Sequence, residues 1–394
     1  MIARDMLATL REMAASYPVV TLTGPRQSGK TTLVRSCFPD HSYANLEQPD
    51  IRRLAESDPH GFFARYPAPL IIDEIQRVPE LASYIQVKVD EAPRQKGAYI
   101  LTGSHQFTLK QTVSQSLAGR TALLSLMPLS IQEIVATDAD LNCDDLLWRG
   151  FMPKLYDEAL DPTVYYRNYL RTYVERDLMQ LMQIRNLAAF ERFLALLAGR
   201  VGQVVNLSGL SGEVGVSSTT IGEWISLLEA SFVVFRLQPY FTNIGKRVIK
   251  SPKLYFVEVG LASSLLGIEN SLQASRDPLR GSLFENMVIA EILKTRLNLG
   301  LEPNLFFLRD SKGFEIDLII KEGRQLRPIE IKSAMTLHPD FTRSVRHFCE
   351  VEKNAAQPAL IYAGEEFPAL KGVKCLNFIN SARLASSAQI QGST

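Results

Sequence analysis

Short apolar runs alternate with helical patterns along residues 1–140 of the chain. The runs predict buried strands, and they lie at 18–23, 42–46, 69–73, 98–102 and 121–126. The segment before the first run, about 3–16, carries apolar residues at helical spacing and predicts an opening helix. Strands that alternate with helices are typical of a parallel α/β sheet. The pattern therefore predicts one α/β domain over 1–140.

The pattern turns helical after residue 140 and stays so to about 200. A winged-helix arrangement is predicted over its last part, with three helices and then two apolar strands, at about 188–200, 207–214, 217–230, 232–237 and 248–256. An α/β pattern follows, and the last residues are rich in Ser, Ala and Gln without periodicity. After the first domain we predict a helical and winged-helix domain, a second α/β domain and a frayed tail, at 141–268, 269–379 and 380–394.

The composition narrows the classes of function. The 394 residues carry a formal net charge of +1, so any basic surface for nucleic acid must be local. No apolar run approaches the ~20 residues that span a bilayer, and the first residues lack the long apolar segment of a secretory signal. The four cysteines are scattered, at Cys37, Cys143, Cys349 and Cys375. We expect a cytoplasmic protein with no membrane partner and no zinc site.

A glycine-rich motif lies between the first predicted strand and a helix. It matches the phosphate-loop pattern G-x-x-x-x-G-K-[ST] and comprises Gly24, Pro25, Arg26, Gln27, Ser28, Gly29, Lys30, Thr31 and Thr32. The glycines let successive backbone N–H groups point at phosphate oxygens, beside the positive end of the helix. Lys30 is expected to reach the β- and γ-phosphates, and the Thr31 hydroxyl to bind Mg²⁺. A chance glycine-rich turn is the alternative, but strand, loop and helix occur in the order that a site for ATP and Mg²⁺ requires.

Polar residues follow two more of the predicted strands. Asp73 is expected to hold Mg²⁺ opposite Thr31, and Glu74 to orient or deprotonate the attacking water. Ser104, with Thr102 as the second candidate, is expected to contact the γ-phosphate or that water. A strand that stops at a solvated acidic turn is the alternative for the acidic pair.

Arg120 follows a predicted helix and precedes the strand at 121–126. An arginine at this place would act as a finger on a nucleotide, held by its own chain or by a neighbour in a homo-oligomer. A surface arginine near a helix end, where it interacts favourably with the helix dipole, explains it equally well.

The predicted winged helix offers one candidate surface for nucleic acid. Its third helix carries Glu223 and Glu229 and no Lys or Arg, so it is not expected to read DNA bases. The turn between the two strands mixes cations and aromatic rings that suit backbone contact and base stacking, at Arg236, Tyr240, Phe241, Lys246, Arg247, Lys250 and Lys253. A solvated basic hairpin is the alternative.

The last domain contains two apolar segments, 313–320 and 328–332, that flank a polar turn and predict a hairpin. Because strand side chains alternate, a turn centred between Gly323 and Arg324 puts four charged side chains on one face, in the pairs Asp317–Glu330 and Glu315–Lys332. Carboxylates directly across a strand pair repel each other, so a metal, a proton or Lys332 must offset them. A charged exposed hairpin is the alternative.

An Asp followed by Glu-x-Lys across a hairpin is the core of the PD-(D/E)XK nuclease arrangement. Asp317 and Glu330, with Glu285 from a preceding helix, are candidate ligands for a second Mg²⁺ or Mn²⁺. Lys332 is the candidate nuclease lysine, because it would position the attacking water or stabilise charge.

The chain resembles the prokaryotic AAA-type P-loop ATPases whose C-terminal half is a domain of unknown function with winged-helix and PD-(D/E)XK-like parts. The segments that carry the resemblance are 22–32, 72–76, 101–104, 116–120, 173–177, 250–256 and 328–332. The resemblance implies an AAA-type parallel sheet domain, then a helical and winged-helix region, then an α/β PD-(D/E)XK-like domain. It also implies that the chain binds and hydrolyses ATP.

Two functions fit these features. The first is an ATPase whose nucleotide state moves a DNA-binding or DNA-cutting C-terminal module. The second is an ATP-gated switch whose catalytically inactive C-terminal domain binds a protein partner. The Asp317, Glu330 and Lys332 set favours the first, and the near-neutral charge favours the second.

Overall fold

The computed structural model describes residues 2–104, 116–137, 142–172, 186–240 and 249–386. These residues form two compact units. The first comprises Met1–Leu129 with two short segments, Ala230–Phe232 and Leu297–Leu301, and the second holds the rest of the chain. The predicted domains at 141–268 and 269–379 both fall largely in the second unit.

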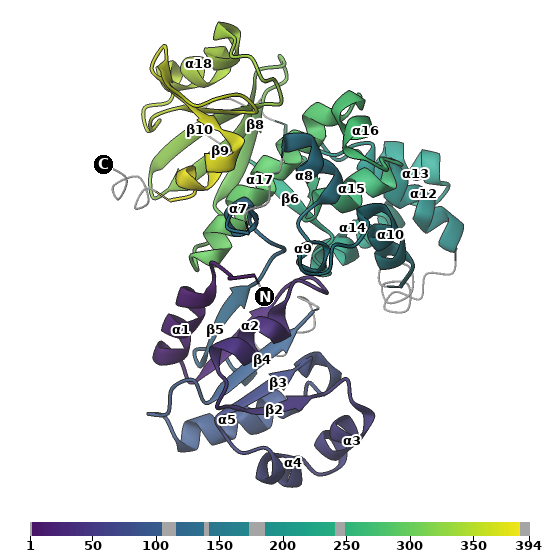
Figure 1. Cartoon of the computed structure of the whole chain (residues 1–394), viewed down its shortest axis with the longest axis vertical. Helices are drawn as coiled ribbons and strands as arrows, with labels where there is room; N and C mark the ends of the chain where they lie inside the picture. Colours follow the sequence, from purple (N-terminus) through teal and green to yellow (C-terminus); the bar gives the residue numbers. More distant parts are fainter. Residues whose placement is uncertain (1, 105–115, 138–141, 173–185, 241–248, 387–394) are drawn as a thin grey trace. The chain divides into compact units, whose positions relative to one another are not determined.

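A five-stranded parallel sheet forms the centre of the first unit (Figure 1). Its order is β2-β3-β4-β1-β5, and the strands are β1 (Val19–Thr23), β2 (Ser42–Asn45), β3 (Leu70–Asp73), β4 (Tyr99–Gly103) and β5 (Thr121–Ser125). Helix α1 (Leu7–Ser16) precedes the sheet, and the helices between its strands are α2 (Lys30–Cys37), α3 (Pro49–Ser57), α4 (Pro59–Arg65) and α5 (Leu81–Glu91). The predicted α/β class and all five predicted strands are confirmed.

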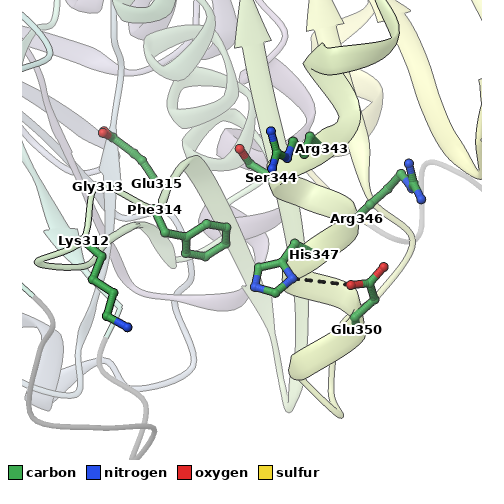
Figure 2. Close-up of a pocket in the computed structure, with 9 residues that line it drawn as sticks. All are labelled: Lys312, Gly313, Phe314, Glu315, Arg343, Ser344, Arg346, His347 and Glu350. Atoms are coloured by element: carbon green, nitrogen blue, oxygen red, sulfur yellow. Dashed lines mark hydrogen bonds and ion pairs between the residues drawn. The ribbon is translucent and has the colours of Figure 1, made fainter.

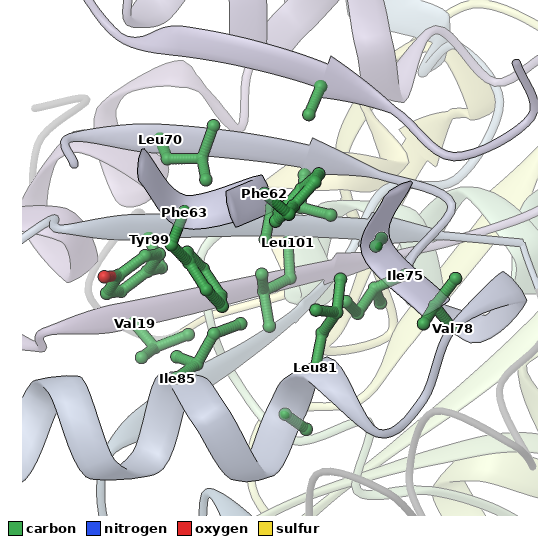
Figure 3. Close-up of a cluster of buried hydrophobic side chains, with 14 of the residues drawn as sticks. Val19, Phe62, Phe63, Leu70, Ile75, Val78, Leu81, Ile85, Tyr99 and Leu101 are labelled. Atoms are coloured by element: carbon green, nitrogen blue, oxygen red, sulfur yellow. The ribbon is translucent and has the colours of Figure 1, made fainter. Parts of the chain in front are cut away.

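Two hydrophobic clusters pack against opposite faces of this sheet, because neighbouring strand residues point to opposite sides. One cluster joins the strands to α4 and α5, and Figure 3 shows Phe62, Phe63 and Ile85 among its members. The other joins the strands to α1 and α2. Each large side chain that is fully buried contributes roughly 1.5–3 kcal/mol. Burial on both faces explains why the strands read as continuous apolar runs in the sequence.

The remaining helices lie mainly in the second unit. They are α7 (Ile131–Val135), α8 (Cys143–Arg149), α9 (Lys154–Asp157), α10 (Pro162–Tyr169), α12 (Leu187–Ala198), α13 (Leu207–Val214), α14 (Ser218–Ala230), α15 (Val259–Leu265), α16 (Ser271–Arg276), α17 (Arg280–Asn298) and α18 (Arg343–Val351). None of the described helices is both long and apolar enough to cross a membrane.

The second unit also contains an eight-stranded mixed sheet, in the order β12-β13-β11-β10-β9-β8-β6-β7. Its strands are β6 (Val234–Pro239), β7 (Lys253–Phe256), β8 (Leu305–Arg309), β9 (Glu315–Glu322), β10 (Gln325–Lys332), β11 (Ala359–Tyr362), β12 (Phe367–Leu370) and β13 (Val373–Asn377). The three helices α12, α13 and α14 precede the antiparallel pair β6–β7, in the order expected of a winged helix. Strand β6 also pairs in parallel with β8, so the two predicted C-terminal domains share one sheet.

Candidate functional site

The glycine-rich loop connects the end of β1 to the first residue of α2, as the motif predicts. Gly24 has φ of 149°, and a Cβ at this position would overlap the backbone carbonyl oxygen of Leu126. Gly29 has φ of 90° and precedes the first helical residue. Both positions therefore require glycine, for its positive φ and, at Gly24, also for the close approach of the backbone just after β5.

Lys30 is buried at the start of α2, and its ammonium turns back onto the loop. Its Nζ donates to the carbonyl oxygens of Gly24 at 3.0 Å and Pro25 at 2.8 Å. Burial lowers the pKa of Lys30 to about 8, although Glu74 and Asp73 favour the charged form. The ammonium is thus held inside the loop by two carbonyls that an anionic ligand can replace.

Asp73 gathers hydroxyl groups from three elements at the end of β3. Its Oδ2 accepts hydrogen bonds from Thr31 Oγ1 and Tyr43 Oη, each at 2.9 Å. Its Oδ1 accepts one from Thr102. The structure brings Thr31 and Asp73 together as the motif predicts, and places Thr102 on the aspartate.

Glu74 follows Asp73 in a left-handed backbone conformation, with φ of 58°. Such a conformation costs a non-glycine residue roughly 1–3 kcal/mol and is found most often at functional sites. Glu74 Oε2 accepts hydrogen bonds from Ser104 Oγ at 3.0 Å and from Gln76 Nε2. Glu74 Oε1 accepts none from the described residues, so one oxygen is held and the other can bind a water.

The remaining residues of the loop differ in exposure. Ser28 is buried, and its Oγ has no hydrogen-bond partner among the described residues. Arg26 is partly exposed, while Gln27 and Thr32 are exposed.

Arg120 lies at the amino-terminal ends of the strands, whereas the loop lies at their carboxyl ends. Its carbonyl oxygen accepts a hydrogen bond from the N–H of Val19, the first residue of β1, whereas the loop follows the last residue of β1. Its guanidinium forms a bidentate ion pair with Asp90, at 2.7 and 2.8 Å. Five strand residues at about 3.3 Å each separate the two ends. The expectation of a finger on the nucleotide of its own chain is therefore corrected, and the role on a neighbour stays a prediction.

The predicted C-terminal hairpin forms with the expected register. Pro328 pairs with Ile319 and Ile329 with Leu318, so the next step places Glu330 against Asp317. Lys332 Nζ lies 2.6 Å from Glu330 and 3.5 Å from Asp317.

Burial and close contact shift the pKa values of this centre. Burial, followed by the nearby charge of Asp317, raises the pKa of Glu330 to about 7. Burial disfavours the charged form of Lys332, but Asp317 and Glu330 raise its pKa overall.

Lys253 enters the same acidic centre from β7. Its side chain is 3% exposed, and its Nζ lies 3.1 Å from Glu285 and 2.6 Å from Glu315. Tyr255 also donates a hydrogen bond to Glu285. Glu315 therefore pairs with Lys253, and not with Lys332 as the hairpin pattern predicted.

The expected metal set in this centre is not reproduced. Among the described residues, no group of three or more His, Cys, Asp or Glu side chains is arranged to hold a metal ion. The candidate ligands Glu285, Asp317 and Glu330 are neutralised by Lys253 and Lys332 instead.

Only part of the basic turn of the predicted winged helix is available to contact nucleic acid. Lys253 is buried, and Arg236 Nη1 pairs with Glu229 at 2.8 Å. The ring of Tyr240 packs edge-on against Phe306, and of the seven residues Lys250 is exposed. Phe241, Lys246 and Arg247 lie outside the described residues, as do 173–177 of the resemblance.

Three family models match the chain in succession. An AAA domain matches residues 16–135, and two domains of unknown function, DUF8612 and DUF4143, match 141–272 and 280–380. Uncharacterized proteins of Mycobacterium tuberculosis and Mycobacterium bovis are each 34% identical over 373 residues, which cover 93% of this chain and 81% of each relative. The chain belongs to the family of these two proteins. Its N-terminal part is an AAA-type ATPase domain.

Two solved structures are also similar to the chain. The Walker-type ATPase of Pyrococcus abyssi has 13% sequence identity and a TM-score of 0.46, with 67% of this chain and 96% of that chain covered. DnaA from Aquifex aeolicus, solved with AMPPCP bound, has 14% identity and a TM-score of 0.30, with 57% and 85% covered.

Magnesium fits the AAA domain at Thr31 and Asp73. Both offer oxygen atoms, which this cation prefers, and they already lie in hydrogen-bond contact. The buried Ser28 hydroxyl is a further polar atom of the loop without a partner among the described residues.

Sequence reasoning missed three residues of the AAA domain site. Arg4 donates to the carbonyl oxygens of Ser28 at 2.6 Å and Met127 at 2.7 Å, and so ties the phosphate loop to the segment after β5. Tyr43 binds Asp73 and Gln76 binds Glu74. Gln76 could have been found by its place two residues after the acidic pair. Arg4 and Tyr43 carry no such signal, because only the fold brings them near.

Proposed function

We propose that the AAA domain binds and hydrolyses ATP and that its nucleotide state controls a DNA-binding C-terminal module. One observation carries the first part of this proposal: Lys30, the Thr31–Asp73 pair and the Ser104–Glu74 pair all lie at the carboxyl edge of one parallel sheet. Ligands of open α/β sheets bind at this edge.

The loop residues supply the binding part of the mechanism. Backbone N–H groups between Gly24 and Lys30 would face the phosphates, because the two glycines allow the required curl. Lys30 would leave the carbonyls of Gly24 and Pro25 for the β- and γ-phosphate oxygens. Magnesium bound at Thr31 and Asp73 would neutralise charge that develops on the phosphates.

Glu74 supplies the chemical part. Ser104 and Gln76 hold its Oε2, which leaves Oε1 to accept a hydrogen bond from the attacking water. A carboxylate in this position orients the water and takes its proton as the bond to the γ-phosphorus forms. Preorganisation by two donors means that little reorientation is needed at that moment.

Proton uptake tests the binding step. A Lys30 whose pKa is about 8 is half neutral at pH 8, and it must be charged when it binds phosphates. We expect ATP binding to take up about half a proton at pH 8 and almost none at pH 6.5, and affinity to fall up to about tenfold per pH unit above 8. Calorimetry in buffers of different ionisation enthalpy measures this uptake. Binding without uptake contradicts the role of Lys30, and the absence of ATP binding overturns the proposed function.

The C-terminal half supports DNA binding through its fold and charge. Helix α17, the antiparallel strands β8, β9 and β10, helix α18 and the parallel strand β11 follow one another in the order of the PD-(D/E)XK arrangement that the sequence resembles. Asp317, Glu330 and Lys332 converge on one face of this hairpin. These features favour a nuclease-like platform that binds DNA.

One observation favours the alternative, an ATP-gated switch that binds a protein partner. Lys253 neutralises Glu285 and Glu315 inside the acidic centre, and this leaves fewer carboxylates for metal-dependent cleavage. A centre filled by a lysine suits a scaffold whose catalytic function is lost.

Linear and branched DNA, with Mg²⁺ or Mn²⁺, separate these functions. We expect the wild-type chain to bind DNA and to change its rate of ATP hydrolysis when DNA is added. Cleavage that is lost in Asp317→Ala would add nuclease activity to the proposal. A chain that hydrolyses ATP but neither binds nor cleaves any of these DNAs would leave the protein-partner switch.

A further inference from the structure

A cavity of about 620 Å³ opens between the turn after β8 and one side of α18. It lies in the second unit and is separate from the nucleotide site. Its lining residues come from these two elements and are Lys312, Gly313, Phe314, Glu315, Arg343, Ser344, Arg346, His347 and Glu350 (Figure 2). Six of these nine residues are ionisable, so the cavity suits a polar ligand.

The cations of this cavity are not compensated from within the protein. Lys312, Arg343 and Arg346 have no side-chain hydrogen bond or ion pair with the described residues, and each lies on the cavity wall. Unpaired cations that share one concave wall focus a positive potential inside it.

The two acids of the cavity are already engaged. Glu315 lies 2.6 Å from Lys253 and 3.5 Å from Arg309, so its charge is offset by two cations that do not line the cavity. Glu350 Oε2 lies 3.4 Å from His347 Nδ1. Three cations face two acids on the wall, and Glu315 has cation partners outside the lining, so the net charge of the wall is positive and the ligand should be an anion.

Two rings lie among these cations. Phe314 and His347 meet edge to face, with centroids 5.3 Å apart. Figure 2 shows the rings between Lys312 on one side and Arg346 on the other. Aromatic faces next to spaced cations are the combination that binds the bases and the backbone of a single strand.

We propose that this cavity binds backbone phosphates of single-stranded DNA. The proposal deepens the proposed function, because it rests on DNA binding by the C-terminal module. It names Lys312, Arg343 and Arg346 as phosphate contacts and Phe314 and His347 as ring contacts.

Two features favour a nucleic acid strand over a phosphorylated peptide. The cations are spread over two elements, and Arg343 and Arg346 lie one helical turn apart, about 5–6 Å between Cβ atoms. A single phosphate would use cations that converge on one point, whereas spaced cations suit repeated phosphates. Glu315 on the cavity wall also stands two residues before Asp317 on β9, so both face the same side of the sheet. A single strand of DNA bound in the cavity would thus continue toward the acidic centre.

Charge reversal tests the cavity in the full chain. We expect the double variant Arg343→Glu with Arg346→Glu to bind a fluorescently labelled oligothymidylate at least about tenfold more weakly than wild type, measured by anisotropy at low salt. Loss of two phosphate contacts should also lower the slope of log affinity against log salt by about 1.4, since each contact to a single strand contributes about 0.7.

The matched control reverses two exposed cations that lie outside the cavity, on the β9–β10 hairpin. Lys321 and Arg324 are exposed, and their side chains form no ion pair with the described residues. The double variant Lys321→Glu with Arg324→Glu changes the net charge by the same amount, so we expect it to bind within about twofold of wild type. The neutral pair Arg343→Gln with Arg346→Gln, compared by circular dichroism, excludes loss through misfolding.

The outcomes separate this proposal from the proposed function. If DNA affinity is unchanged in the Arg343 and Arg346 double variant, or falls equally in both double variants, the cavity is not the binding site. The proposed DNA-binding function would then still hold. A wild-type chain that binds linear or branched DNA but no oligothymidylate overturns the cavity alone. A chain that hydrolyses ATP but binds none of these DNAs overturns both. Competition by a phosphoserine peptide or inorganic phosphate at concentrations where oligothymidylate does not compete overturns the strand assignment.

Discussion

We expect Glu74→Gln to bind ATP with nearly wild-type affinity and to hydrolyse it two to four orders of magnitude more slowly. Glutamine keeps the size of the side chain and a carbonyl oxygen that accepts from Ser104 and Gln76, so the local structure should persist. It cannot take a proton from water. Removal of a general base raises the barrier by about 3–5 kcal/mol, which gives this loss of rate.

Single-turnover hydrolysis and equilibrium binding, measured on the same preparation, check this result. Glu80→Gln is the matched control, because Glu80 is exposed and makes no side-chain hydrogen bond at the start of α5. We expect the control to hydrolyse ATP at the wild-type rate. A Glu74→Gln variant with normal turnover would show that another group activates the water.

The second large effect is expected at Lys30. Lys30→Ala removes an ammonium that is buried in the loop against the carbonyls of Gly24 and Pro25. Truncation of one partner in a buried charge pair costs about 2–5 kcal/mol. We therefore expect ATP affinity to fall by tens- to thousands-fold and turnover to be lost at any accessible ATP concentration.

Calorimetric titration with ATP and a phosphate-release assay measure both effects. Lys96→Ala serves as the control, since Lys96 is exposed and forms no ion pair with the described residues. It should leave binding and turnover unchanged. Hydrolysis at the wild-type rate in Lys30→Ala would refute the phosphate-loop assignment, whereas a fall in both lysine variants would indicate a general effect of charge.

The nucleotide site was predictable from the sequence where chemistry and local structure coincide. Gly24 and Lys30 occur in one continuous motif, and Asp73 and Glu74 end a strand that is apolar throughout because it is buried on both faces. The local sequence pattern therefore predicts both the strand that positions these residues and their roles in the nucleotide site. The register of the C-terminal hairpin was also predictable, since alternation along two adjacent strands fixes which side chains share a face.

The remaining parts depend on contacts that are distant in the sequence. Arg4 reaches the loop from a segment before α1, and Lys253 reaches the acidic centre from a strand that composition alone assigned to a basic turn. The identity of a residue as lysine does not reveal whether its side chain is solvated or buried between carboxylates. Arg120 shows the same limit. It precedes β5 in the sequence, and only the parallel pairing of β5 with β1 reveals that this end of β5 lies beside the start of β1, away from the loop.

The pairing of β6 with β8 has a consequence for how this gene can be divided. Residues 238–239 of one matched family segment hydrogen-bond with residues 306–307 of the next. A polypeptide cut between 272 and 280 would leave the N–H and C=O groups of β8 unpaired along one side, and such a border recruits other chains. We therefore expect each segment to need the strand that the other supplies, whether it is expressed alone or exchanged between relatives.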